Sequence, residues 1–327
     1  MDWREGLSGS RRGDMRRFLN LTVIASLAIG IAGPQAFAAT KVNLLYIPGG
    51  DFVPSFVAKD QGIFERHGLD VDMTIAQNGS VISAALAADQ AQIGVPTPPV
   101  LLQANEQGLD LVIVAGATVL PFPAGASGVI ARNDSNLKGP QDLAGHKVGV
   151  PGFGGSFDVI TRNWVKAAGV DYKKVNWVEL QFPQMGDALK SGLVDAVAAV
   201  NPFYARILGG KLGYDIGNPW SSAPKGTMIV LYAATRAWAT KNKEAVAGFR
   251  ASLNEAIAYI NDPSHLPSVR DSITKWTKLP PQAAASIAIP DDLEPQAKPD
   301  GLTFWIKASR EQGLIKGNPD PASLIAP

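Results

Sequence analysis

Residues 147–168 decide the fold, and they read KVGVPGFGGSFDVITRNWVKAA. Residues 148–150 are a short apolar run, residues 151–156 are rich in glycine, and residues 157–168 carry apolar side chains at helical spacing. A short buried strand that passes through a glycine-rich turn into a helix is the repeating unit of a covered parallel sheet. The stretch therefore predicts an α/β protein.

The same alternation of strand and helix fills the chain on both sides of this stretch. The first half has expected strands at 42–47, 69–75, 92–95 and 111–115 and helices at 53–61, 81–88 and 98–107. The second half has expected strands at 148–150, 175–180 and 196–200 and helices at 157–168, 184–191 and 202–208. We therefore expect two lobes built on one plan, each a mainly parallel sheet covered by helices, with a ligand cleft between the lobes.

The predicted boundaries follow from two apolar stretches that cross between the lobes. They are a signal peptide at 1–38, a first part of lobe 1 at 39–124, a hinge crossing at 125–132, lobe 2 at 133–225, a second hinge crossing at 226–235, and the completion of lobe 1 with C-terminal helices at 236–327. A double crossing makes a hinge, and hinged lobes close on ligands.

The first 38 residues have the order of a secretory signal peptide. The arginines at 11, 12, 16 and 17 precede an apolar run at 21–32, and a mostly small-residue stretch follows it up to Ala38. A membrane anchor is the alternative, but the run has about twelve residues and a bilayer needs about twenty. Residues 16–19 resemble a twin-arginine export signal, but we favour export by the general secretory route. We therefore expect export to the periplasm and cleavage near Ala38.

Composition excludes several classes of function. The 327 residues are 46% hydrophobic and 18% charged, which is typical of a globular protein. The chain has 30 Lys and Arg against 29 Asp and Glu, so its net charge is too small to attract nucleic acid electrostatically. The chain has no Cys, and its histidines, at 67, 146 and 265, lack metal-ligand spacing. We expect no catalytic residue, metal, cofactor or nucleic-acid partner, and no enzyme activity.

Candidate ligand-binding residues follow the predicted strands, where open α/β sheets bind their ligands. The loop before residue 157 offers free backbone N–H groups at a helix start. Several of the side chains are equally suited to cap the helices that they precede. The candidates are Gly50, Asp51, Asn78, Gly79, Ser80, Thr97, Gly155, Ser156, Phe157, Asn201 and Phe203.

Four segments resemble a known family, the solute-binding proteins of ABC importers for nitrate, sulfonates, taurine and thiamine precursors. They are FVAKDQGIFERHGLDV at 56–71, residues 78–86, DLAGHKVGV at 142–150 and LKSGLVDA at 189–196. The resemblance implies a periplasmic-binding-protein fold of the second topological type, which closes by a hinge on one small solute. It further implies a monomer that delivers the solute to an ABC transporter permease in the inner membrane.

The candidates leave the solute open. Hydroxyl and amide groups at Asn78, Ser80, Thr97, Ser156 and Asn201 suit a small organic anion, either sulfonate-like or carboxylate-like, and this is our expectation. Asp51 suits an amino group, as in an aminopyrimidine or thiamine precursor, unless it only caps its own helix. A ligand-binding partner of a membrane sensor is a further alternative. An enzyme on the same fold is disfavoured because the cysteines associated with such enzymes are absent.

Overall fold

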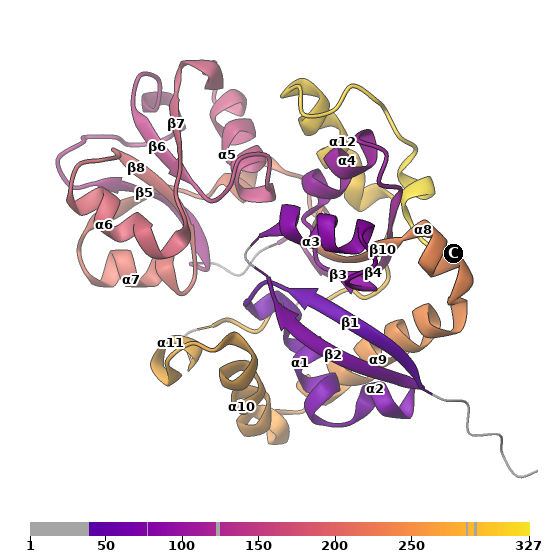
Figure 1. Ribbon diagram of the computed structural model, residues 1–327. Coiled ribbons are helices and arrows are strands. Elements are labelled where there is room, and N and C mark those ends of the chain that lie inside the picture. Colours follow the sequence, from indigo (N-terminus) through magenta and orange to yellow (C-terminus); the bar gives the residue numbers. More distant parts are fainter. Residues whose placement is uncertain (1–38, 77, 122–124, 286, 291–292) are drawn as a thin grey trace, which may run out of the picture. The chain divides into compact units, whose positions relative to one another are not determined.

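The computed structural model describes residues 39–327 except 77, 122–124, 286 and 291–292 (Figure 1). The predicted signal peptide therefore lies outside the described residues. Contacts join the described residues into a single unit, in which two sheets can be distinguished. In this part of the chain, no helix combines the length and the apolar character needed to cross a bilayer.

The first sheet has the strand order β2-β1-β3-β10-β4. Strands β1, β2 and β3 are parallel, and β10 runs antiparallel to both of its neighbours. The buried patterns of β4 and β10 show that both faces of the sheet are covered there, as continuous apolar runs predict. The bounds are β1 Thr40–Tyr46, β2 Leu69–Ile75, β3 Ile93–Gly94, β4 Leu111–Val119 and β10 Met228–Thr235.

The second sheet has the equivalent order β7-β6-β8-β5-β9. Its bounds are β5 Ser127–Arg132, β6 Lys147–Val150, β7 Asn176–Glu179, β8 Ala196–Val200 and β9 Gly213–Gly217. Strand β5 is the antiparallel one here. In each sheet, the antiparallel strand is the first that the chain forms after arriving from the other sheet.

This arrangement places the segments that we expected as crossings. Most of 125–132 is strand β5 of the second sheet, and most of 226–235 is strand β10 of the first. The passages between the sheets precede these strands. Strand β9 was not predicted, because Gly213–Gly217 has two glycines and one acid in five residues and lacks the apolar run of the other strands.

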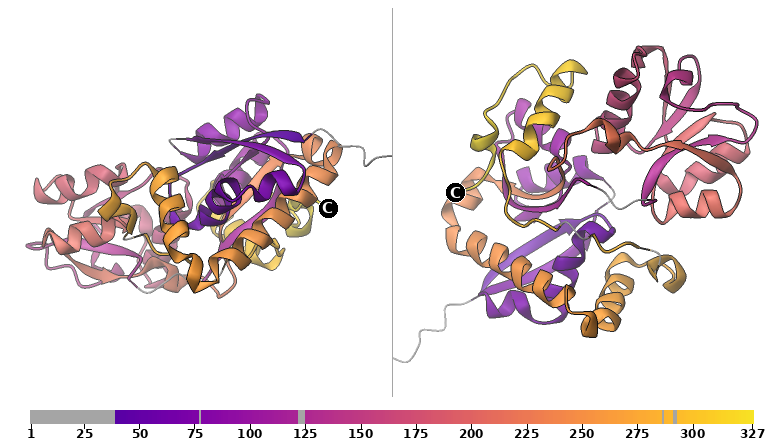
Figure 2. Two further views of the ribbon diagram at one scale, coloured as in Figure 1. Left: turned by 90° about the horizontal axis from the view of Figure 1, so that it is seen from below. Right: turned by 180° about the vertical axis from the view of Figure 1, so that it is seen from behind.

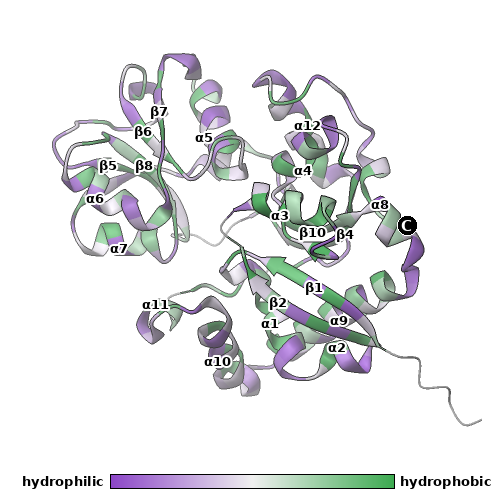
Figure 3. Cartoon of the chain, viewed as in Figure 1, coloured by the Kyte–Doolittle hydropathy of each residue, from purple (hydrophilic) through white to green (hydrophobic). Residues whose placement is uncertain are grey.

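Twelve α-helices are described, and Figure 3 shows hydrophobic and hydrophilic residues side by side along them. In α5, the buried face includes Val159, Ile160 and Trp164. The bounds are α1 Val53–Asp60, α2 Ile63–Arg66, α3 Gly79–Ala87, α4 Pro98–Glu106, α5 Ser156–Ala167, α6 Met185–Lys190, α7 Phe203–Gly209, α8 Arg236–Lys241, α9 Lys243–Ile260, α10 Leu266–Thr277, α11 Pro281–Ala285 and α12 Asp300–Glu311. Short 3-10 helices include η1 Gly50–Phe52, η4 Phe182–Gln184 and η5 Pro219–Ser222.

The C-terminal helices pack on the first lobe. Helices α9 and α10 contact α1, and the view from behind in Figure 2 shows α9 as the long orange helix lying across the strands of the first sheet. The rings of Phe64 and Phe249 stack at 5.6 Å between centroids, which ties α2 to α9. Helix α12 contacts α4 and also reaches α5 of the second lobe. The helices of the C-terminal tail therefore pack mainly against elements that carry or cover the first sheet.

Candidate functional site

A cavity of about 210 Å³ lies at the carboxyl ends of β1, β3 and β8. This is the edge where parallel α/β sheets bind their ligands. Both lobes and the C-terminal region contribute to its wall. The lining residues are Ile47, Pro48, Gly49, Gly50, Asp51, Phe52, Val95, Thr97, Ala126, Phe182, Val200, Asn201, Val230, Ile287, Ala288 and Pro290.

Asp51 is the one ionisable side chain among these lining residues. It lies in η1, and its atom Oδ1 is buried without a hydrogen-bond partner in the described part of the chain. Burial raises the pKa of the Asp51 carboxyl, and the nearby Thr118 hydroxyl opposes this shift. The Asp51 charge in turn adds to the burial that raises the pKa of Tyr232. A ligand that donates N–H groups to Asp51 would stabilise its ionised carboxylate in this environment.

Thr97 also turns a free oxygen toward the interior. It precedes α4, but its side chain makes no capping hydrogen bond. Its Oγ1 is buried and finds no partner among the described residues. Because a buried hydroxyl normally has a partner, this atom is a candidate for a ligand contact.

The helix starts beside the cavity offer few N–H donors to an anion. Helix α4 begins with Pro98 and Pro99, which have no backbone N–H. In α1, the N–H of Val53 already donates to the Gly50 carbonyl, and Pro54 follows it. The N-termini of these two helices are therefore depleted of N–H donors for an anion.

Asn201 enters the wall from the second lobe, and both ends of its side chain are engaged. Its Oδ1 accepts from the Ala205 N–H at 3.1 Å, and its Nδ2 donates to the Gly125 carbonyl oxygen at 3.3 Å. Asn201 thus caps the start of α7 and holds the chain where it enters β5. A neighbouring aromatic wall is supplied by Phe182, whose ring stacks on Phe203 with 5.8 Å between centroids. Phe203 supports the wall and does not itself line the cavity.

Of the predicted residues, the structure brings Gly50, Asp51, Thr97 and Asn201 to this cavity. Asn78, Gly79 and Ser80 lie outside it at the start of α3, where Asn78 Oδ1 accepts from the Val81 N–H at 3.0 Å. That interaction is the capping role that the sequence left open.

Gly155, Ser156 and Phe157 also lie outside the lining, at the start of α5. The loop before α5 is closed by its own helix, because the Gly154 N–H donates to Asp158 Oδ2 at 2.8 Å. Phe157 stacks on Trp220. The Ser156 hydroxyl is buried with no hydrogen bond in the described part.

Sequence reasoning missed the apolar part of the wall. Val95 and Val200 are the last residues of the predicted strands 92–95 and 196–200, so their position alone could have indicated them. Ile287, Ala288 and Pro290 carry no such signal, since they follow the last predicted elements of the sheets by many residues.

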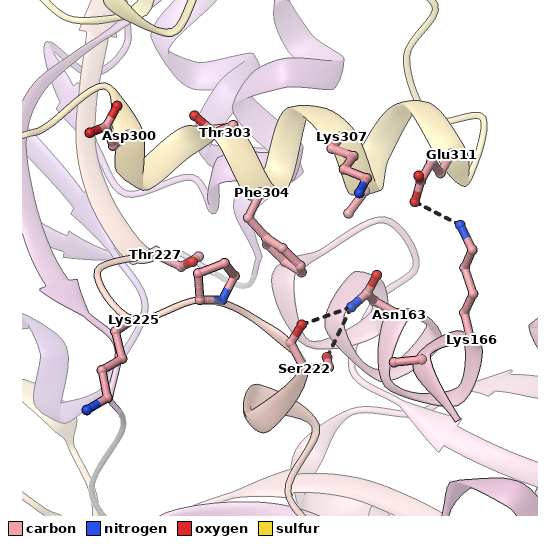
Figure 4. Close-up of a pocket in the computed structure, with 13 residues that line it drawn as sticks. Asn163, Lys166, Ser222, Lys225, Thr227, Asp300, Thr303, Phe304, Lys307 and Glu311 are labelled. Atoms are coloured by element: carbon pink, nitrogen blue, oxygen red, sulfur yellow. Dashed lines mark hydrogen bonds and ion pairs between the residues drawn. The ribbon is translucent and has the colours of Figure 1, made fainter. Parts of the chain in front are cut away.

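A second cavity of about 500 Å³ lies between α5, residues 222–227 and α12 (Figure 4). Asn163 Nδ2 donates to the Ser222 side-chain oxygen at 3.1 Å, and Lys166 pairs with Glu311 at 2.8 Å. Figure 4 shows Phe304 pointing from α12 toward the segment that holds Ser222. No predicted site residue lines this cavity. The described residues contain no group of three or more acidic or histidine side chains placed to hold a metal.

The overall architecture matches solved structures of binding proteins. The periplasmic aliphatic sulphonate binding protein SsuA from Escherichia coli superposes with a TM-score of 0.74 at 21% identity, covering 88% of this chain and 97% of that one. The periplasmic nitrate-binding protein NrtA from Synechocystis gives a TM-score of 0.68 at 15% identity, covering 86% and 84%. The fold is therefore the two-lobed periplasmic-binding-protein fold that the sequence predicts.

The family model described as NMT1/THI5 like matches residues 50–265, and the chain belongs to this family. It is 29% identical over 163 residues to the formylaminopyrimidine-binding protein of Halalkalibacterium halodurans, which covers 50% of this chain and 48% of that protein. It is 25% identical over 264 residues to the nitrate/nitrite binding protein NrtA of Synechococcus elongatus, covering 72% and 58%. The matched regions thus span about half the length of these curated relatives.

Proposed function

We propose that this protein is an extracytoplasmic solute-binding protein that encloses one small solute and delivers it to an ABC importer. The observation that carries the proposal is the cavity at the strand ends, whose wall both lobes supply. Family membership supports it, because the relatives include proteins described as binding nitrate or an aminopyrimidine.

The chemistry of the cavity favours a solute with a flat apolar body and an N–H-donating nitrogen. Among the described residues that line it, none is Lys, Arg or His, and most are apolar. An anion placed there would lose its hydration among apolar side chains, with no cationic side chain in the described lining to pair with it, which is a large electrostatic cost. The proposal therefore takes the aminopyrimidine alternative in place of the organic anion that we first expected.

Each polar lining group then has a distinct task. Asp51 accepts hydrogen bonds from the amino group or ring N–H, and Thr97 bonds the adjacent edge of the solute. Phe52 and Phe182 contact the ring faces. When the lobes close, the residues Ala126, Val200 and Asn201 cover the solute from the second lobe.

The partner and the location belong to the same proposal. Export by the segment 1–38 places the mature chain, as a monomer, where it meets the permease of its importer. One relative is the nitrate import ATP-binding protein NrtC of Synechocystis, which matches 93% of this chain over 50% of its own length. The proposed cycle of capture and release includes no catalytic step.

A thermal-shift screen of the exported protein tests the solute class. The protein is unfolded and refolded to remove carried-over ligand, then mixed with 4-amino-2-methylpyrimidine, taurine, alkanesulfonates, aromatic carboxylates or nitrate. A solute at one hundred times its Kd adds about 2.7 kcal/mol, which is a shift of several degrees. We expect stabilisation by the aminopyrimidine. Stabilisation by the anions alone would overturn the solute class.

A further inference from the structure

The C-terminal region supplies a third wall to the cavity. Between α11 and α12 the chain passes the cavity, and Ile287, Ala288 and Pro290 line it. We call residues 287–290 the strap. Ile287 is buried, and the strap carries no charged side chain, so it offers the cavity apolar surface.

Both sides of the strap are attached to lobe 1. Toward α11, Arg270 Nη1 donates to the Ile287 carbonyl oxygen at 2.6 Å. Toward α12, the Glu294 N–H donates to the Ala117 carbonyl and the Gly116 N–H donates to the Pro295 carbonyl, each at 2.9 Å. The chain around the strap is therefore bonded to α10 on one side and to β4 on the other.

The strap lies in contact with the loop that carries Asp51. A Cβ atom added to Gly50 would overlap the Ala288 carbonyl oxygen and lie 3.0 Å from the Ile287 side chain. A Cβ atom on the preceding Gly49 would meet nothing closer than Asp51 Oδ2, at 3.8 Å. The close approach of the strap thus depends on glycine at position 50 and not at position 49.

We infer that the strap is the wall that selects the solute by size. Its contact with Gly50 sets the space beside Asp51, so a solute that reaches the carboxylate must fit under residues 287–290. Because the strap belongs to lobe 1, it acts on the solute before the second lobe closes. The inference rests on the proposed function for the identity of the solute, and on the packing against Gly50 for the strap itself.

The first arm of the test needs no solute. Hydrogen–deuterium exchange is measured on the full exported protein and on the Gly50→Ala and Gly49→Ala variants, in peptides that span 287–290. We expect faster exchange of these peptides in Gly50→Ala, because the added methyl group displaces the strap, and wild-type exchange in Gly49→Ala. Unchanged exchange in Gly50→Ala, or an equal rise in both variants, would overturn the inference.

The second arm measures the Kd of 4-amino-2-methylpyrimidine by calorimetry. Ala288→Trp fills the space under the strap and should weaken binding at least about tenfold, whereas Ala285→Trp, on the exposed end of α11, should bind as the wild type does. If Ala288→Trp does not fold, Ala288→Leu replaces it. Wild-type affinity in the position-288 variant would overturn the role of the strap. Absence of binding by the wild type would instead contradict the proposed solute, and the exchange pair would then decide on the strap alone.

Discussion

Arg162 Nε donates to Asp158 Oδ1 at 2.6 Å, one turn apart on α5, and the carboxylate is 3% exposed. The other oxygen of Asp158 accepts from the Gly154 N–H, so the helix start is occupied by a side chain of its own helix. Burial raises the pKa of Asp158, and the Arg162 charge opposes that shift. Asp158 therefore occupies the Gly154 N–H of the glycine-rich loop, which the sequence indicated as a place for a ligand.

Asp158→Ala should destabilise the protein by about 3 kcal/mol, because it leaves a largely buried guanidinium without its partner. Chemical unfolding at neutral pH measures the loss. The control is Lys298→Ala, which removes an exposed pair with Glu294 at the same spacing and should cost less than about 1 kcal/mol. Equal losses of stability in the two variants would show that the Asp158–Arg162 ion pair contributes no more than an exposed pair does.

Asp51→Asn should change both binding and the pH dependence of stability. Since burial raises the native pKa of Asp51 above the unfolded value, the native state holds the proton more tightly. The wild-type free energy of unfolding should therefore fall as pH rises from the unfolded pKa through the higher native pKa. Asp51→Asn should lack this decline and be the more stable protein at pH 7.

The same variant should bind the aminopyrimidine at least about tenfold more weakly, because a hydrogen bond to a charged group is lost. Asp72→Asn, on an exposed position of β2, is the control for both measurements. Retained affinity in Asp51→Asn would remove the carboxylate from the site.

Thr97→Val should separate a ligand-binding hydroxyl from a structural one. Its Oγ1 has no partner in the described part of the chain, so the melting temperature should stay the same or rise slightly while the Kd weakens about fivefold to tenfold. Thr161→Val is the matched control, because Thr161 Oγ1 donates to the Phe157 carbonyl at 2.6 Å. That variant should lose about 1 kcal/mol of stability and keep its affinity. The reverse pattern would assign Thr97 a structural role.

Substitution of Phe182 should weaken solute binding more than substitution of Phe203. Phe182 lines the cavity, whereas Phe203 stacks behind it with an interplanar angle of 8°. Titration calorimetry should show a larger loss of affinity for Phe182→Leu than for Phe203→Leu, because the second variant acts only by freeing the first ring. A larger effect at Phe203 would place that ring, and not Phe182, against the solute.

The local sequence predicted most of the elements because their signals are local. Helix α5 was expected at 157–168 and is observed at Ser156–Ala167, and β8 was expected and found to end at Val200. The apolar periodicity and the proline and glycine positions that define such elements lie within a few residues of one another. Strand β9 escaped prediction because its pairing with β5 stabilises a segment that its own residues do not favour.

The candidate site was predicted in part, for a similar reason. Carboxyl ends of parallel strands converge in every open α/β sheet, so Asp51, Thr97 and Asn201 could be brought together from strand positions alone. Whether a cap residue turns into the cavity is a matter of packing. Asn78 caps α3, whereas Thr97 makes no capping bond and leaves its hydroxyl free.

The sequence by itself determined the α/β class, the two lobes and the family, because each depends on patterns within short segments. It also indicated the strand ends as the place for a candidate site. Only the tertiary structure decided the chemistry of the cavity. Because Pro98 has no N–H and the Val53 N–H is already bonded, two helix starts beside the cavity offer few donors to an anion. The strap, more than two hundred residues beyond Gly50, forms the wall beside Asp51. Burial, and with it the raised pKa of Asp51, arises from segments that are distant along the chain.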